Sequence, residues 1–414
     1  MNHAVNSILK AREPIGWRLG LERMRRICSL LGMPQNRFAS IHVVGTNGKT
    51  SVARMTAALL DAHGVPAGAY LSPHIDEWRE RILVAGELIG DAAFTEALVR
   101  AEQAAEAADR AAGGEGPVTQ FELVTAAAFV ALAAARVKVG VIEAGLGGRL
   151  DATNVIPSRV TVLTSVGLDH TEWLGGTLAE IAAEKLAVLR DRTVLVRGDL
   201  APEAEQVAER EASRHHARAV GPAPVDPVLA EGLPPYQRQN LGLALAAAAV
   251  IVGELRPDAV EAAVASLSIP GRGQVLDGDP PVILDAAHNA DGARALAAAL
   301  EELTGGSKVV CCTAVLEGKD ADAIVAALAP RCERAVCTEI PEEAIAAGGR
   351  PGGRSIAASR LAELFAAKRI GAEAEAELER AVARGRELAG ELGVPLLVTG
   401  SHFLIGSALA SLRG

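Results

Sequence analysis

The feature that most constrains the fold of this chain is the alternation of short β-branched runs with alanine-rich stretches at helical spacing. The apolar runs are SIHVVG, GVIEAG, RVTVLTSV and TVLVRG in the first half, then PVILDAAHN, SKVVCCTAV, RAVCTEI and VPLLVTGS. Strands that alternate with helices are typical of parallel sheets with helical crossover connections. The pattern therefore predicts an α/β fold.

The alternation is interrupted once, at SIPGRGQVLDGDPP, residues 268–281, where proline and glycine crowd a short polar stretch. A chain of 414 residues is also longer than one hydrophobic core usually supports. We therefore expect a larger N-terminal domain, residues 1–270, and a smaller C-terminal domain, residues 271–414. In the second domain the charged run AEAELERAVARGREL predicts a helix.

Composition excludes several classes of protein. A formal net charge of −10 argues against a nucleic-acid binder, which usually carries a basic surface. The five cysteines show no CxxC spacing and the start MNHAVNSILK has no apolar core, so we expect a protein of the reducing cytoplasm. Cys311 and Cys312 lie in an apolar run and are expected to be buried. The longest apolar run, 123–135, is too short to span a membrane.

The stretch IHVVGTNGKTSV contains a candidate phosphate loop, Gly45 to Ser51. Glycines allow a close approach to phosphate, the following helix points its amide groups at the anion, and Lys49 adds a positive charge. Thr50 or Ser51 could offer a hydroxyl to Mg²⁺. The standard pattern GxxxxGK[ST] would need glycine at position 43, where this chain has valine. An ordinary strand-to-helix turn is the alternative.

Other polar residues follow predicted strands of the first domain: Ser72, Glu143, and Asp169 with His170. Ligands of doubly wound sheets bind at the carboxyl ends of the strands, so these residues are expected near the loop. Glu143 is a good Mg²⁺ ligand candidate because a carboxylate ending an apolar strand is otherwise costly to bury. Ser72 and His170 are weaker alone, since an isolated histidine is more often structural.

Two further segments have polar residues in the same position. GLGGRLDATN, Gly145 to Asn154, combines three glycines with an arginine and an aspartate shortly after Glu143, which favours a binding loop over a flexible turn. In the second domain DAAHN, Asp285 to Asn289, places an acid and a histidine at the end of a strand. The residues alone predict a second polar crevice there.

Together these motifs carry a resemblance over nearly the whole chain. HVVGTNGKTS, SPHIDEWRERILVAGELI, TQFE, EAGLGGRLDATN, LDHTEWLGGTLAEIAAEK, PGR, LDAAHN and VTGSHFLIG follow the order seen in folylpolyglutamate synthases and bifunctional dihydrofolate synthases of the Mur ligase superfamily. The resemblance implies a phosphate-loop ATPase domain with a mostly parallel sheet that binds ATP and folate. It also implies a smaller Rossmann-like glutamate ligase domain.

The resemblance also implies the chemistry. Family members transfer the γ-phosphoryl group of ATP to a carboxylate of a folate or dihydropteroate, and the amine of L-glutamate then displaces phosphate from the acyl phosphate. Carboxylates are poor electrophiles, and phosphorylation supplies a leaving group. The protein then chiefly positions the reactants and neutralises charge.

Site residues follow from matching each motif. The implied ATP contacts are Gly45, Thr46, Asn47, Gly48, Lys49, Thr50, Ser51, Asn240, Arg272 and Asp285. The implied ligands of two Mg²⁺ ions are Ser51, Ser72, Glu143, His170 and Lys185. The implied catalytic residues are Lys49, His170 and Lys185. The implied substrate contacts are Leu19, Gly20, Leu21, Glu22, Arg23, Thr119, Gln120, Phe121, Glu122, Arg149, Leu150, Asp151 and His288.

Lys185 matches a lysine that is carbamylated in this family. A carbamate would replace a cation that repels metal by a carboxylate that helps to bind the second Mg²⁺. Family members are commonly monomers, so we expect a monomer with small-molecule substrates and no nucleic-acid or membrane partner.

Some residues depart from the family pattern. Thr50 stands where folate ligases commonly have glycine, which brings GTNGKTS closer to the Mur ligases. Gly273 and Leu186 also differ, and His402 is assigned no role. One alternative is a Mur-type ligase of cell-wall precursor synthesis, although LGLERM and the 44 residues before Gly45 fit folate ligases. The other is a phosphate-loop module without ligase activity, which would not explain Arg272 and Asp285.

Overall fold

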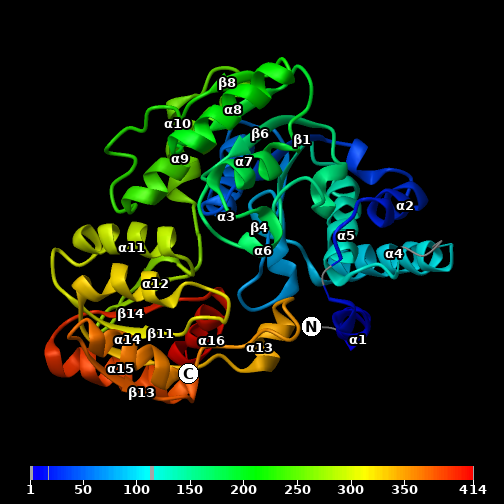
Figure 1. The fold of residues 1–414 in the computed structure, drawn as a ribbon. Coiled ribbons are helices and arrows are strands. Elements are labelled where there is room, and N and C mark those ends of the chain that lie inside the picture. Colours follow the sequence, from blue (N-terminus) through cyan, green and yellow to red (C-terminus); the bar gives the residue numbers. More distant parts are fainter. Residues whose placement is uncertain (1–2, 17, 112–115, 414) are drawn as a thin grey trace. The chain divides into compact units, whose positions relative to one another are not determined.

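The structure is a computed structural model that describes residues 3–16, 18–111 and 116–413 (Figure 1). The chain divides into two compact units. The first contains residues 1–230 and 239–267, and the second contains residues 231–238 and 268–414. The sequence-based limits, 1–270 and 271–414, treat each domain as one continuous segment, whereas residues 231–238 group with the second unit.

The first unit is built on a sheet with strand order β4-β3-β2-β5-β1-β6-β7-β8. The strands are β1 Ala39–Val44, β2 Ala67–Tyr70, β3 Ile82–Val84, β4 Glu87–Leu88, β5 Val139–Glu143, β6 Ser158–Leu163, β7 Val194–Arg197 and β8 Arg218–Val220. The strands β2, β5, β1, β6, β7 and β8 pair in parallel in this order, and β3 and β4 add an antiparallel edge next to β2. The carboxyl ends of β1, β5 and β6 therefore lie side by side at one edge.

Helices cover this sheet. The helices of this unit are α1 His3–Arg12, α2 Glu22–Leu30, α3 Lys49–Ala62, α4 Asp91–Arg110, α5 Gln120–Ala134, α6 Thr171–Leu174, α7 Leu178–Leu186, α8 Pro202–Arg214, α9 Pro235–Val252, whose first four residues group with the second unit, and α10 Pro257–Ala265. α3 contacts β1, β2 and β5 and is itself covered by α10. α5 contacts β2 and β3 and packs against α2 and α4, and its residues 122–132 are all buried. Alanine allows this helix to be enclosed on all sides.

The second unit contains a smaller sheet with order β13-β12-β11-β14-β10-β9. The strands are β9 Arg272–Leu276, β10 Val282–Asp285, β11 Val309–Thr313, β12 Cys332–Cys337, β13 Gly371–Ala374 and β14 Leu396–Thr399. The helices are α11 Ala290–Leu303, α12 Ala321–Leu328, α13 Glu342–Ala347, α14 Ala358–Ala367, α15 Leu378–Leu392 and α16 His402–Arg413. Cys311 packs in the core shared with α11, α12 and α14, whereas Cys312 lies by Gly385 of α15. Helices thus cover both faces.

The predicted α/β fold class is confirmed, and two local details differ from the prediction. The break at 268–281 contains β9, which pairs antiparallel with β10. The predicted helix over AEAELERAVARGREL begins only at Leu378, because Ala374 ends β13. β9 and β13 lie at the two edges of the sheet. One neighbouring strand supplies their hydrogen bonds there, so few apolar side chains are needed.

All five cysteines are buried free thiols, as expected for Cys311 and Cys312. Burial raises the pKa of Cys28, Cys312 and Cys337 to about 12. These residues act as small apolar core groups.

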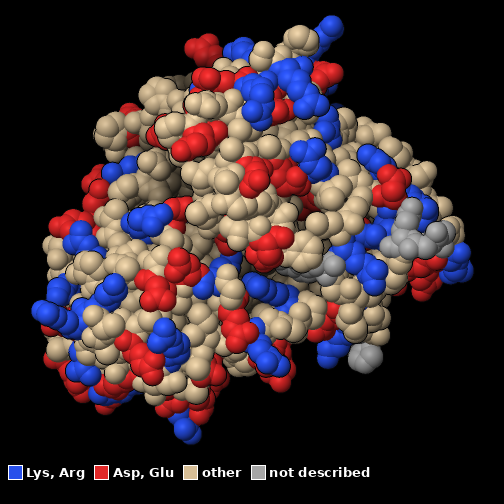
Figure 2. Space-filling view, in the orientation of Figure 1, with Lys and Arg blue, Asp and Glu red and all other residues tan. Residues whose placement is uncertain are grey.

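On the face shown in Figure 2, acidic and basic side chains are interspersed. Across the described part of the chain, no helix combines the length and the apolar character that crossing a membrane would need.

Candidate functional site

The predicted phosphate loop joins β1 to α3, with Gly48 at the N-cap of the helix and Lys49 as its first residue. Glycine is required at both ends of the loop. A Cβ on Gly45 would lie 1.9 Å from Thr164 Oγ1, and a Cβ on Gly48, whose φ is +86°, would lie 2.4 Å from Asn240 Oδ1. The structure thus brings Asn240 of α9 directly against the loop.

The loop is held by the segment that follows β6. Asn47 donates its amide to Ser165 Oγ at 2.9 Å, and its carbonyl accepts from Thr164 Oγ1 at 2.6 Å and from Ser165 Oγ at 3.1 Å. The Thr46 hydroxyl exchanges hydrogen bonds with the backbone of Gly167. Sequence reasoning missed this support. The hydroxyl pair at the end of RVTVLTSV is the signal that could have found it.

Two lysines converge on the Gly45 carbonyl. Lys49 Nζ donates to it at 3.1 Å and to the Thr46 carbonyl at 3.2 Å, while Lys185 Nζ from α7 donates to it at 2.9 Å. Lys185 is only 3% exposed. Burial, followed by repulsion from Lys49, lowers the pKa of Lys185 to about 7. Near pH 7 the Lys185 amine is therefore neutral in a large fraction of the molecules.

Glu143, at the end of β5, lies against the start of α3. Its buried carboxylate accepts the Thr50 hydroxyl at 2.9 and 3.0 Å and the Ser72 amide at 3.0 Å. Ser51, in the same first turn of α3, is 1% exposed. The structure brings the Glu143 carboxylate together with the Thr50 hydroxyl, and oxygen donors are the ligands that Mg²⁺ prefers. The residues present therefore fit a magnesium ion.

His170 precedes α6 in a left-handed conformation, with φ of 51°. Its amide donates to Asp169 Oδ1 at 2.9 Å, and its Nε2 lies 3.9 Å from the same oxygen. Within residues 3–16, 18–111 and 116–413, no three His, Cys, Asp or Glu side chains group closely enough to hold a metal. A metal here would depend on hydroxyls and phosphate as well.

In the loop after β5, Asp151 organises the backbone. Its buried carboxylate accepts the Leu146 and Thr153 amides at 2.8 and 3.0 Å and the Thr153 hydroxyl at 2.5 Å. Burial raises the pKa of Asp151. Arg149 instead pairs with Glu184 at the surface, at 3.0 Å, and Leu150 is 39% exposed.

The predicted substrate segments at Leu19–Arg23 and Thr119–Glu122 lie together. Arg23 Nε donates to both carboxylate oxygens of Glu122 at 3.0 Å, and this pair is buried. Thr119 caps α5 through a reciprocal pair of hydrogen bonds with Glu122. The Phe121 ring packs against Gly145, because a Cβ added to this glycine would lie only 2.5 Å from the ring. The loop after β5 therefore also adjoins these segments.

In the second unit, Asp285 ends β10 beside Arg272 of β9. Its carboxylate accepts the Tyr236 hydroxyl at 2.5 Å and the Ala287 amide at 2.8 Å. Burial raises the pKa of Asp285, and Arg272 opposes this shift. Sequence reasoning missed Tyr236. The His288 ring lies 4.7 Å from that of His402, centroid to centroid, in an edge-on arrangement.

Comparison with known proteins gives a consistent result. Residues 43–196 match the Mur ligase middle domain, and residues 271–402 match the Mur ligase glutamate ligase domain. The dihydrofolate synthase/folylpolyglutamate synthase of Mycobacterium tuberculosis is 36% identical over 380 residues, 80% of this chain and 78% of that protein.

Solved structures are similar over nearly the full length. Folylpolyglutamate synthase from Mycobacterium tuberculosis complexed with ADP has a TM-score of 0.87 at 32% identity, with 98% of each chain covered. A bifunctional folylpolyglutamate synthase/dihydrofolate synthase with Mn, AMPPNP and L-glutamate bound has a TM-score of 0.81 at 27% identity, covering 99% of this chain and 98% of that one.

Proposed function

The chain belongs to the folylpolyglutamate synthase/dihydrofolate synthase family of the Mur ligase superfamily, and we propose how its residues divide the work of the reaction. It is an ATP-dependent ligase that adds L-glutamate to folates and uses a divalent metal ion. We propose that dihydropteroate is a second acceptor, because the Mycobacterium tuberculosis relative carries both activities in its name. The observation that carries the proposal is the convergence of Lys49, Lys185 and Glu143 around the loop.

The phosphate loop binds the triphosphate in this proposal. Lys49, at the first turn of α3, would contact the β- and γ-phosphates, where its charge and the helix amides neutralise the transferring group. Asn240 is a proposed ATP contact because it touches the loop at Gly48. Arg272 and Asp285 are proposed ATP contacts of the second unit.

Ser51, Ser72, Glu143 and His170 would hold the first Mg²⁺, and Lys185 would help to hold a second. A bound Mg²⁺ neutralises phosphate charge during transfer. Thr50 adds a role that the sequence did not predict. Its hydroxyl holds the Glu143 carboxylate in place, as residues behind metal ligands commonly do.

Carbamylation of Lys185 is supported by its environment. A neutral amine attacks CO₂, forms the new N–C bond and releases one proton, which leaves a carbamate anion. The pKa of about 7 supplies that neutral amine. A carbamate beside Lys49 would also replace charge repulsion by attraction.

The acceptor would lie along Leu19–Arg23, Thr119–Glu122 and Arg149–Asp151. This is supported by the contact of Arg23 with Glu122 and by the Phe121 ring, which adjoins Gly145 at the start of the loop that contains Asp151. There its carboxylate would receive the γ-phosphoryl group, and the glutamate amine would then displace phosphate. His288 is the proposed substrate contact of the second unit.

A substrate panel tests this proposal. Purified protein is given ATP, Mg²⁺, L-glutamate and either tetrahydrofolate or dihydropteroate, and both phosphate release and product mass are measured. We expect release that requires acceptor and glutamate together, with one glutamate added to the product mass. Release independent of both would favour a phosphate-loop module, and ligation only to a cell-wall precursor would favour a Mur-type ligase.

A further inference from the structure

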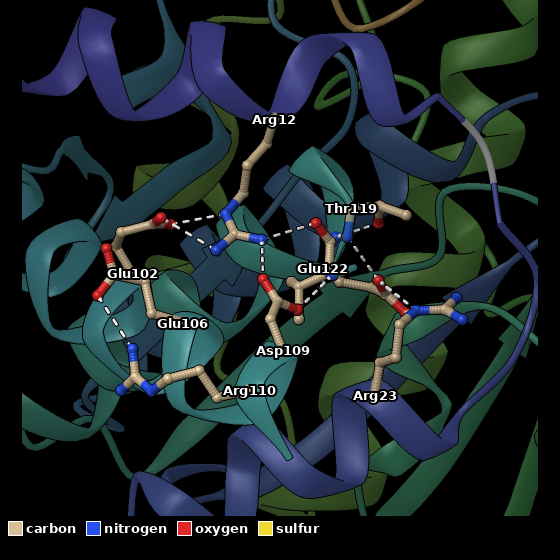
Figure 3. A network of polar contacts seen from close by, with 9 residues as sticks. Arg12, Arg23, Glu102, Glu106, Asp109, Arg110, Thr119 and Glu122 are labelled. Carbon is tan, nitrogen blue, oxygen red and sulfur yellow. Dashed lines mark hydrogen bonds and ion pairs between the residues drawn. The ribbon is translucent and has the colours of Figure 1, made fainter. Parts of the chain in front are cut away.

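Arg12, the last residue of α1, is a buried side chain within a partly buried polar cluster to which the proposed reaction assigns no role (Figure 3). It is 5% exposed. Its Nε and Nη2 each donate to one carboxylate oxygen of Glu102 on α4, at 2.7 and 3.0 Å. Its Nη1 donates to Asp109 Oδ2 at 3.0 Å and to the Val118 carbonyl at 2.8 Å. One guanidinium thus joins α1, α4 and the segment before α5.

The peptide groups of Val118 are held on both sides. Asp109 Oδ1 accepts the Val118 amide at 2.8 Å while Arg12 binds the Val118 carbonyl. A second tie runs from Gln120 Nε2 to the Leu9 carbonyl of α1 at 3.0 Å. The backbone that enters α5 is therefore fixed to both α1 and α4.

The contacts continue from this backbone to α2. The Thr119 amide donates to Glu122 Oε2 at 2.8 Å, and Glu122 in turn accepts from Arg23. Arg23 Nη2 then donates to the Arg18 carbonyl at 2.7 Å. Figure 3 shows Thr119 and Glu122 between Arg12 and Arg23. The chain of contacts thus ends at the Leu19–Arg23 segment.

We propose that Arg12, together with Asp109, is a positioning residue for the folate or dihydropteroate acceptor. It acts through Val118 on Thr119–Glu122 and, through Glu122, on Leu19–Arg23. The inference rests on the proposed function, because these segments are its proposed acceptor contacts.

The guanidinium suits this task. Its donors form a rigid planar fork that binds a carboxylate with two hydrogen bonds and still reaches two other acceptors, whereas an ammonium cannot reproduce that geometry. A buried paired charge also cannot shift without losing its partners. The first turn of α5 is therefore held in one register relative to α4.

Steady-state kinetics on the full chain test the proposal. Arg12→Met should raise the KM of tetrahydrofolate by about tenfold or more, and leave the KM of ATP within about twofold. Arg12→Lys should give an intermediate value. Asp109→Asn loses one acceptor of the cluster with little change of shape, and it should likewise raise the KM of tetrahydrofolate but not that of ATP. It tests the proposal even if Arg12→Met fails to fold. Hydrogen exchange at the Val118 amide should quicken in each variant.

Arg110→Met is the matched control. Arg110 lies on the same helix and pairs with Glu106 at 3.9 Å, but both side chains are more than half exposed, so both KM values should stay at wild-type levels. Folded Arg12 and Asp109 variants with an unchanged acceptor KM would overturn the proposal, as would equal increases for ATP and acceptor. If wild-type protein adds no glutamate to either acceptor, the proposed function itself fails, which is a separate result.

Discussion

Replacing Lys185 by methionine should make the protein more stable at pH 7 while abolishing ligation. The Lys185 side chain is fully buried in the first unit, and its pKa falls from 10.5 to about 7. In CO₂-free buffer the unfolded chain therefore binds this proton between about pH 7 and 10.5, where the folded protein does not. Methionine has a similar shape, is apolar, and carries no such cost.

The magnitude follows from the shift. At about 1.4 kcal/mol for each pKa unit, the lysine costs roughly 4 to 5 kcal/mol of unfolding free energy below pH 7. The substitution also removes the hydrogen bond from Lys185 to the Gly45 carbonyl. This loss lowers the unfolding free energy by only about 1 kcal/mol, because Lys49 still donates to that carbonyl. A net gain of about 3 kcal/mol remains, which corresponds to roughly 6 to 12 °C in the Tm of a domain of this size.

The pH dependence provides the sharper measurement. The wild-type protein gains stability as pH rises from 7 to 10.5, so the advantage of Lys185→Met should be full below pH 7 and close to zero near pH 10.5. Thermal unfolding of both proteins in CO₂-free buffer at pH 6.5, 8 and 9.5 measures this, and Lys185→Arg serves as the charged control. A Lys185→Met variant that is less stable than wild type at pH 6.5, or a stability difference that does not shrink as the pH rises, would show that burial of the charged lysine does not destabilise the protein.

Three further predictions concern the same region. Lys185→Ala should lose ligation and regain part of it in acetate, which supplies the missing carboxylate; full activity without acetate would contradict the metal role. Gly48→Ala should weaken AMPPNP binding by about tenfold or more in calorimetry, because its Cβ would stand 2.4 Å from Asn240 Oδ1. Thr50→Val removes the hydroxyl on Glu143 and should weaken Mn²⁺ binding by roughly 10-fold to 100-fold in titrations followed by electron paramagnetic resonance; unchanged affinity would argue against that role.

Much of the fold could be predicted because the central strands are apolar on both faces. β1, β5 and β6 are buried along nearly their whole length, and each contains a short run rich in β-branched residues. β9, with sequence RGQVL, and β13, with sequence GAEA, lack that signature. Each pairs with one neighbour at an edge, so its hydrogen bonds depend on the rest of the sheet and not on its own composition.

The site residues that could be predicted are adjacent in the sequence, whereas their supporting partners are distant in it. Gly45 to Ser51 could be found because a phosphate loop needs its glycines and its lysine at adjacent positions. Thr164 and Ser165 support that loop from 117 and 118 residues away, and Tyr236 reaches Asp285 from 49 residues away. Only the folded chain brings such partners together, so their spacing in the sequence carries no signal.

The burial of all five cysteines makes the native chain a convenient background for site-specific labelling. Maleimides react with accessible thiolates, and the raised pKa values of Cys28, Cys311, Cys312 and Cys337 slow that reaction further. A cysteine introduced at Glu209 on α8 and another at Lys368 after α14, both exposed positions, would therefore be modified well ahead of the native thiols. A donor and acceptor dye on this pair would follow the separation of the two units by energy transfer while ATP is added, without removing any native cysteine.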